Sequence, residues 1–323
     1  MLGSVEKLKE KVMTTRHLVD KRLKNYAIAS IIVFNMVDIP FNRDSAGGQI
    51  SKPEEKLDFI KETINDFMRF APGVYLEYFV IINANTDCEL TKAYYQEIDG
   101  TKTKYNTTIK VLDAPEEKYH GPFASRQALY HAYPNFRYYF TCDADCIPIK
   151  DNWYKDGIDK MCEDDEIGSI GAWMTVKPFQ CPDHIEYTDV EGNVIPPPAV
   201  YYTSGFFSFI RGHIYQLFDQ YWGKDWFTQG KCYRDYAVCE GELMFAHRIQ
   251  QLGYKVADFN DEEMDAPLCW HVPDVLFPNA TVGNQFVYPT KSKVSPFFHT
   301  YLKLHMPKEY KELIEYAERF AKN

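Results

Sequence analysis

The stretch RYYFTCDADCIP, residues 137–148, carries the pattern that decides the fold. It begins as a short aromatic and apolar strand and runs into two aspartates, Asp143 and Asp145, separated by one small residue. Alternate residues near a strand end point the same way, so both carboxylates are expected to face one pocket. Two carboxylates this close repel each other unless a cation lies beside them, and hard oxygen ligands favour Mg²⁺ or Mn²⁺. The alternative interpretation is a solvated turn rich in aspartate.

The composition is that of a globular, acidic chain. Its 323 residues can bury a large core; 45% of them are hydrophobic, 25% are charged, and the formal net charge is −10. The sequence contains no basic run of the kind found in nucleic-acid-binding proteins, so we expect no nucleic-acid partner. A phosphate-bearing substrate must then be held by a metal ion and a few local cations rather than by a broad positive field.

The cysteines and the N-terminal residues bear on the cellular compartment. The eight cysteines are scattered without a C-x-x-C pair, which favours a reducing environment. The opening MLGSVEKLKEK lacks the apolar core of a signal peptide, and nowhere do eighteen apolar residues run together. We therefore expect a cytoplasmic protein without a membrane span. Residues 1–25 are predicted to form an amphipathic helix packed on the core, whose basic face leaves peripheral membrane association open.

Strand and helix patterns alternate between residues 26 and 143. The first strand is an apolar run ending at Asn35, the second ends at Asn83, and the third ends at Asp113. This alternation predicts an α/β fold with a mainly parallel twisted sheet, right-handed crossovers and helices on its faces. Ligands of such sheets bind at the carboxyl ends of the strands, so the residues at these ends are expected to line a ligand site.

Two segments after the acidic motif carry further candidates. A strand followed by a helix contains Ser204 and Gly205, where glycine lets a sugar or a phosphate approach the backbone closely. Glu240 and Glu242 stand at the start of an amphipathic helix that is predicted to end at Gly253. A glutamate at a helix N-terminus stays ionised, as a general base must. The alternative is that both glutamates only cap and solubilise the helix.

The order of these segments resembles the GT-A glycosyltransferases, whose Asp-x-Asp motif follows a core strand and holds a metal bound to a sugar-nucleotide diphosphate. The resemblance spans roughly residues 26–271. It includes a glycine followed by an arginine ahead of the motif strand, matched by Arg126. It also includes an acidic pair followed by Leu, Arg and Gly-Tyr. This pattern places Glu242 where most relatives have Asp, and Gly241 stands where they have the other acid.

The resemblance implies a role for each of several residues. Asp143 is expected to lie by the ribose and the metal, and Asp145 and His271 are expected to ligate the metal, which is Mn²⁺ or Mg²⁺. Glu242, with Glu240 close by in the chain, is expected to act as general base in an inverting transfer. The alternative for His271 is a buried, hydrogen-bonded histidine.

The implied donor is a nucleotide sugar, most simply a UDP-sugar, and the acceptor is the hydroxyl of a glycan, a glycolipid or a protein-linked sugar. Asn83 stands where the family carries an acid that reads the base, and an amide can donate as well as accept. Arg126 is expected to contact the base or the diphosphate, the alternative being a surface arginine. The predicted donor site comprises Asn35, Asn83, Asp113, Arg126, Asp143, Ser204 and Gly205.

A single large GT-A (Rossmann-like) domain is predicted over residues 26–275, with a nucleotide-binding half at 26–150 and an acceptor half at 151–275. Residues 276–323 are predicted to form a C-terminal extension that ends in a helix.

Three other functions remain open on the sequence alone. A retaining GT-A enzyme can also carry a Ser-Gly pair after a strand, as in YYTSGFF. A sugar-phosphate nucleotidyltransferase shares the sheet and the acidic site, but it should carry a Gly-rich loop with Arg after the first strand, which MVDIPFNRDSAGGQ fits poorly. A non-catalytic carbohydrate-binding protein would keep the aromatic residues, 16% of the chain, without needing the acids.

Overall fold

The computed structural model describes residues 25–34, 53–84, 89–113, 122–144, 146–148, 150–178, 187–188, 191–195, 199–224, 226, 241, 243–259 and 268–270. The predicted N-terminal helix and the C-terminal extension lie outside these residues. So do five predicted site residues, namely Asn35, Asp145, Glu240, Glu242 and His271.

Within the described residues, strands and helices alternate as predicted. The first half, residues 26–150 in the prediction, contains β1 (Asn25–Phe34), α2 (Pro53–Arg69), β2 (Tyr78–Ala84), α3 (Glu89–Ile98), β3 (Thr108–Asp113), α4 (Pro122–Ala132), β4 (Phe136–Asp143) and β5 (Cys146–Pro148). The second half contains α5 (Trp153–Glu163), β6 (Ile167–Pro178), β7 (Tyr187–Thr188), β8 (Val194–Ile195), β9 (Ala199–Arg211), α6 (Gly212–Trp222), α8 (Met244–Gln251), β10 (Lys255–Asp258) and β11 (Leu268–Trp270). None of the described helices is both long and apolar enough to cross a lipid bilayer.

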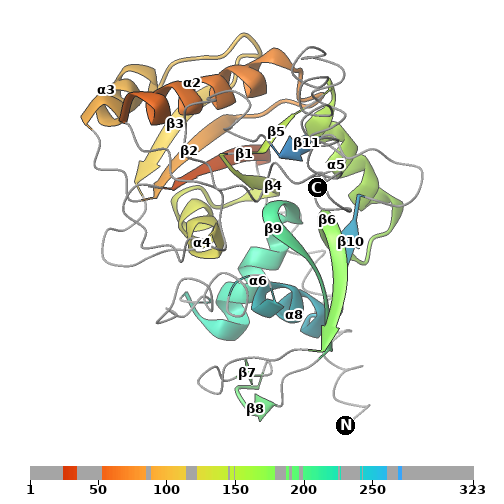
Figure 1. Ribbon diagram of the computed structural model, residues 1–323. Helices are drawn as coiled ribbons and strands as arrows, with labels where there is room; N and C mark the ends of the chain where they lie inside the picture. The colour runs from red at the N-terminus through yellow and green to blue at the C-terminus, as the bar shows by residue number, and fades with distance from the viewer. Residues whose placement is uncertain are drawn as a thin grey trace, which may run out of the picture.

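In the described part of the chain, seven strands form one sheet in the order β10-β6-β9-β4-β1-β2-β3 (Figure 1). β1 pairs in parallel with β2 and with β4, β2 pairs in parallel with β3, and β6 pairs in parallel with β10. β9 runs antiparallel to both β4 and β6. The predicted α/β class with a mainly parallel sheet is therefore confirmed, with one reversed strand among the seven described strands of this sheet.

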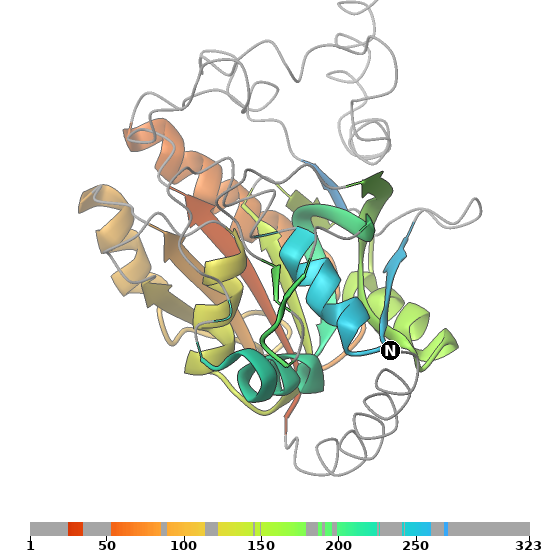
Figure 2. The same ribbon diagram turned by 90° about the horizontal axis from the view of Figure 1, so that it is seen from below.

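Helices cover both faces of the sheet, as its continuously apolar strands require. Helices α2, α3 and α5 pack on one face of the sheet, and α4, α6 and α8 pack on the other (Figure 1). Figure 2 shows the same arrangement from below. Side chains of β1 alternate between the two cores: Ile31 contributes to the first and Ile32 to the second. One domain with two apolar layers results, and its central strands are buried on both sides.

The outer edge of β3 is covered by its own chain. The backbone N–H of Ile109 donates to the carbonyl of Thr101 at 2.8 Å, and Gly100 N–H donates to the carbonyl of Ile109 at 2.9 Å. The N–H of Val111 donates to the carboxylate of Asp99 at 3.0 Å. Three outward groups of this edge strand, the N–H groups of Ile109 and Val111 and the carbonyl of Ile109, are thus occupied by the residues that precede it.

Candidate functional site

Three predicted site residues lie along the carboxyl ends of neighbouring parallel strands. Asn83 is opposite Val33 of β1 on one side and opposite Asp113 of β3 on the other. Asp143, the last residue of β4, is opposite Ile32 of β1. The unbroken register therefore brings these residues to the same carboxyl end of the sheet, as the sequence predicts. The side chains of Asn83 and Asp113 belong to one face, and that of Asp143 belongs to the other.

Asp143 also lies where the direction of chain progression reverses. From β1 the chain moves outward through β2 to β3, and it then returns to the opposite side of β1 as β4. The carboxyl ends of the strands on either side of such a reversal flank a crevice, which is where open α/β sheets bind their ligands. Asp143, which is half-buried, ends the strand on one side of this reversal.

The residue between the two aspartates of the motif is firmly held. Ala144 is buried, its N–H donates to the carbonyl of Ile32 at 3.0 Å, and its own carbonyl accepts a hydrogen bond from the Thr63 hydroxyl at 2.8 Å. The motif therefore leaves the sheet along a defined path. Nothing in the sequence around Thr63 signals this contact, since 81 residues separate it from Ala144.

Asn83 and Asp113 form a hydrogen-bonded pair. The Nδ2 of Asn83 donates to Oδ1 of Asp113 at 2.8 Å, and because a carboxylate only accepts, this bond settles which side-chain atom of Asn83 is the nitrogen. The Asn83 Oδ1 is buried and has no hydrogen-bond partner among the described residues. Asp113 is exposed at the strand end. The pair thus combines a buried acceptor on Asn83 with an exposed carboxylate on Asp113.

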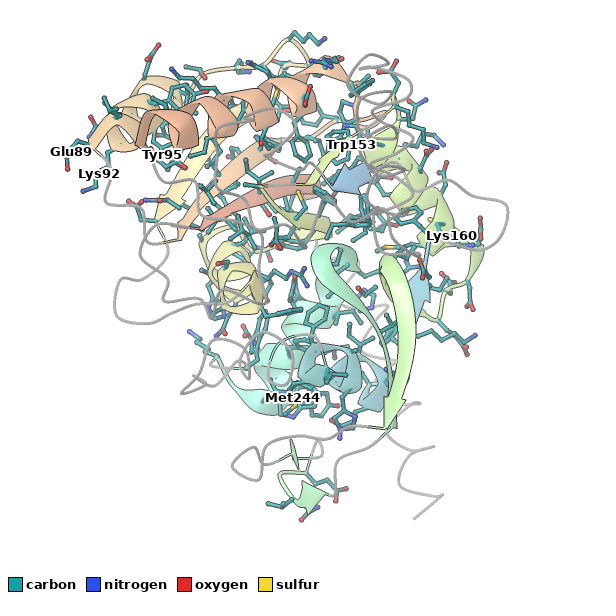
Figure 3. All side chains as sticks on the ribbon, in the orientation of Figure 1. Glu89, Lys92, Tyr95, Trp153, Lys160 and Met244 are labelled. Atoms are coloured by element: carbon teal, nitrogen blue, oxygen red, sulfur yellow. The ribbon has the colours of Figure 1, made fainter. Side chains whose placement is uncertain are left out.

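Two buried hydroxyl groups of α3 were not predicted as site residues. Thr91 and Tyr95 are one helical turn apart on the buried face of α3, and neither hydroxyl has a hydrogen-bond partner among the described residues. Burial raises the pKa of Tyr95 well above its ordinary value, with smaller contributions from Tyr94 and Asp113. Tyr95, labelled in Figure 3, therefore stays a hydrogen-bond donor. Two polar residues at i, i+4 on an otherwise apolar helix face were the available signal.

Arg126 is a buried residue of α4, with 1% of its surface exposed, so the alternative of a surface arginine is wrong. Its guanidinium lies 4.2 Å from the ring centroid of Phe123 and 5.5 Å from that of Phe245 on α8. A guanidinium is weakly hydrated and stacks on aromatic faces, which makes such burial tolerable. Arg126 thereby joins the helix that precedes the motif strand to the helix that follows Glu242.

The amphipathic helix predicted to end at Gly253 is α8. Leu243, Ala246 and Ile249 are buried, and Gly253 ends the helix with a φ of 83°. Its N-cap is Leu243, without a side-chain capping hydrogen bond. Met244, the first residue of α8, is labelled in Figure 3. The two glutamates before it lie outside the described residues.

Arg248, the arginine that follows Glu242 and Leu243 in the pattern shared with the GT-A family, has a structural role. Arg248 donates from Nη1 to the carbonyl of Trp226, and its guanidinium lies 5.1 Å from the ring centroid of Trp222. The Trp226 ring stacks on Tyr215 at 5.0 Å. Arg248 therefore holds α8 against the chain that follows α6.

Ser204 and Gly205 lie inside β9, near an irregular part of the ladder. Ser204 is opposite Ala172 of β6, and the register shifts on both sides of this pair. Such irregularities bend a strand and are common beside active sites. The predicted order of a strand followed by a helix is confirmed by β9 and α6.

A short antiparallel pairing joins the segment after the motif to a segment late in the chain. Cys146, Ile147 and Pro148 of β5 pair with Trp270, Cys269 and Leu268 of β11. Within the described ranges, no three His, Cys, Asp or Glu side chains are grouped so that they could hold a metal ion. Asp145 precedes β5 and His271 follows β11, both beyond those ranges.

Comparison with known proteins bears on the fold. No protein-family model matches the sequence, and no curated protein matches it. Residues 1–349 of TarS from S. aureus align with 15% identity over 76% of this chain and 61% of that chain, with a TM-score of 0.38. GalNAc-T7 with UDP, GalNAc and Mn²⁺ aligns with 13% identity over 71% and 41%, with a TM-score of 0.40.

A third solved structure is the CMP:2-keto-3-deoxy-manno-octonic acid synthetase complexed with CTP. It aligns with 10% identity over 73% of this chain and 89% of that chain, with a TM-score of 0.39. At such identities and scores the likeness is confined to the general arrangement of sheet and helices. The chemistry proposed for this chain therefore depends on its own residues.

Proposed function

We propose that this chain is a metal-dependent GT-A glycosyltransferase that moves a sugar from a nucleotide-sugar donor to a hydroxyl acceptor. The observation that carries the proposal is the position of Asp143, at the carboxyl end of β4 and beside β1, where the chain progression reverses. An acid at this position suits a ligand whose phosphates require a cation, because the chain as a whole carries a net charge of −10.

Asp143, Asp145 and His271 are the proposed ligands of Mn²⁺ or Mg²⁺. The pairing of Cys146 with Trp270 supports this set, because Cys146 directly follows Asp145 and Trp270 directly precedes His271. Consecutive Cα atoms lie about 3.8 Å apart, so each of these two proposed ligands is one residue away from the pairing. When bound, the metal supplies charge stabilisation for the departing diphosphate.

The remaining proposed residues bind the donor and move a proton. Glu242, with Glu240 nearby in the chain, takes the proton of the acceptor hydroxyl as its oxygen bonds to the anomeric carbon. The bond from that carbon to the diphosphate oxygen breaks, and the nucleoside diphosphate leaves with the bonding electrons. Attack from the face opposite the leaving group inverts the anomeric centre.

Donor recognition is assigned to the strand ends. Asn83 and Asp113 supply acceptors for the N–H groups of a base, which a UDP-sugar can satisfy through the imide N–H of uracil. The proposed donor site also includes Asn35, Ser204, Gly205 and Arg126. Because Arg126 is buried against Phe123 and Phe245, we propose that it supports the donor site by holding α4 and α8 together.

The proposal is tested by screening nucleotide sugars for divalent-metal-dependent thermal stabilisation and turnover, since a ligand that binds only the folded state raises the melting temperature. We expect Asp145→Asn to lower turnover by about 100-fold or more, because it weakens the metal site. Glu242→Gln should retain donor stabilisation and lose transfer. Asp159→Asn, a change to an exposed carboxylate of α5 paired with Lys155, is the matched control.

Other outcomes would contradict the proposal in distinct ways. Release of pyrophosphate from a nucleoside triphosphate and a sugar phosphate would identify a nucleotidyltransferase. Sugar binding without turnover in wild type and Asp145→Asn alike would identify a binding protein. Retained anomeric configuration in the product, read by NMR, would overturn inversion and the role of Glu242 as its base.

A further inference from the structure

One contact reaches the acidic motif from a distant helix. The Thr63 side chain lies on α2, is fully buried, and donates its hydroxyl proton to the carbonyl of Ala144 at 2.8 Å. Helical threonines commonly return this bond to a carbonyl of their own helix, one turn earlier. Thr63 instead donates its hydrogen bond to the residue between Asp143 and Asp145.

The bonded carbonyl belongs to the peptide unit that leads directly into Asp145. A peptide unit is planar, so the direction of its carbonyl also sets the direction of its N–H and of the next Cα. The N–H of Ala144 is held as well, by the carbonyl of Ile32 at 3.0 Å. With both its own N–H and its carbonyl bonded, Ala144 leaves the chain little freedom in how it enters Asp145.

The chain beyond the motif is tied to the same helix. The N–H of Ala71, just after α2, donates to Asp151 Oδ1 at 2.7 Å, and the N–H of Asn152 donates to the carbonyl of Ala71 at 2.6 Å. Trp153, labelled in Figure 3, meets the Phe67 ring of α2 edge to face at 5.3 Å. The segment from Ala144 to the start of α5 is therefore held to α2 at both of its ends.

A glycine shows how closely this second attachment is packed. Gly73 has a φ of +77°, and a Cβ added there would come within 2.9 Å of the Asn152 Cα and 2.6 Å of its Oδ1. Backbone that approaches so near leaves no space for a side chain. The chain just after α2 and the start of α5 are therefore in close contact.

From these contacts we infer that Thr63 is a positioning residue for the proposed metal site. Its hydroxyl orients the Ala144–Asp145 peptide and thereby sets the affinity for the metal, without touching the metal. The inference rests on the proposed function, because it assumes that Asp145 binds a divalent cation.

The test measures Mn²⁺ binding by the full chain, using electron paramagnetic resonance of free Mn²⁺ at a temperature where circular dichroism shows every variant folded. Thr63→Val keeps the side-chain volume and removes the donor, so we expect the Kd for Mn²⁺ to rise about 10-fold, as for other groups that orient metal ligands. Thr63→Ser keeps the hydroxyl and should restore affinity to within about 2-fold of wild type.

Thr91→Val is the matched control. Thr91 is also a fully buried helical threonine, but its hydroxyl has no partner among the described residues, so its replacement should leave Mn²⁺ affinity unchanged. Equal affinity in Thr63→Val and wild type would overturn the inference while leaving the proposed function intact. A weakened Thr63→Ser, or an equally weakened Thr91→Val, would overturn it too. Absence of Mn²⁺ and Mg²⁺ binding by wild type would overturn the proposed metal site itself.

Discussion

In the half of the sheet formed by β3, β2, β1 and β4, every strand pairs in parallel without a shift of register. In the half formed by β9, β6 and β10, the ladder shifts between Lys255 and Val256 and on both sides of Ala172. The regular half aligns strand ends, which is what a site built from several strands needs. In the irregular half the strand ends are not aligned, and the register shifts bend the strands locally, as bulges do. Rigid placement and adaptable shape are thus divided between the two halves.

The largest effect is expected at Gly212, where the two halves of the sheet meet. A Cβ added at Gly212, where β9 becomes α6, would overlap the carbonyl oxygen of Phe136 at the start of β4. We expect Gly212→Ala to lower the free energy of unfolding by about 3 kcal/mol or more, because backbone atoms on both sides must shift. Urea denaturation measures the loss.

The control is at the other end of the same helix. Gly223 has a φ of +76° and no heavy atom near the added Cβ, so Gly223→Ala should cost only about 1 kcal/mol of backbone strain. Equal losses in the two variants would show that the contact with Phe136 does not join the halves.

Acid should weaken the second half selectively. His247 is buried on α8, and burial together with the charge of Arg248 lowers its pKa to about 4. The unfolded chain takes up this proton near pH 6.5 and the folded chain only near pH 4, so stability is full above pH 6.5 and falls as the pH drops toward 4. The expected loss is at most about 3 kcal/mol.

Urea midpoints at several pH values between 7 and 4 test this expectation. His247→Gln removes the titrating group, so its stability should fall less steeply than that of wild type over this range. Parallel curves for the two proteins would contradict the assigned pKa. The other buried histidine among the described residues, His213, also belongs to the second half, and His213→Gln shows whether it contributes.

The hydrogen bonds that attach α5 to the regular half should contribute less to stability. Tyr154 of α5 lies with its hydroxyl 2.9 Å from the carbonyl of Ile28 in β1 and 3.0 Å from that of Tyr138 in β4. Tyr154→Phe should cost about 1–2 kcal/mol in urea denaturation, the value of a buried hydrogen bond. Tyr215→Phe is the control, because that buried hydroxyl has no partner in the described structure. If both variants lose the same stability, the hydrogen bonds of Tyr154 do not hold α5 to the sheet.

The smallest effect is expected at the outer edge of the irregular half. Lys255 at the start of β10 lies 2.8 Å from Asp164 and 2.7 Å from Glu166, and these contacts raise the pKa of Lys255. Lys255→Ala should lower the melting temperature slightly in dilute salt and not at all in 1 M NaCl, because exposed ion pairs are screened. A loss that persists in high salt would show that the side chain acts through packing instead.

The sequence predicted the regular half better than the irregular one. Continuous apolar strands separated by amphipathic helices are local patterns, and they placed Asn83, Asp113 and Asp143 correctly at strand ends. The strand containing Ser204 was also predicted, but its antiparallel direction depends on which neighbours it meets. No local pattern states that.

The contacts around the motif were beyond local patterns for the same reason. Thr63 and Ala144 are 81 residues apart, and β5 and β11 pair across more than a hundred. The burial of Arg126 had one local signal, Phe123 three residues earlier on the same helix face. The predicted roles of Asp145, Glu242 and His271 stay predictions.

The turn that covers β3 limits how copies of this protein can associate. The N–H groups of Ile109 and Val111 are already bonded to Thr101 and Asp99, so a strand from another molecule cannot use these two donors. An assembly that lengthens the sheet through this border must first displace Asp99. Aggregation by edge-to-edge stacking is therefore opposed on the side of the molecule that carries Asp113.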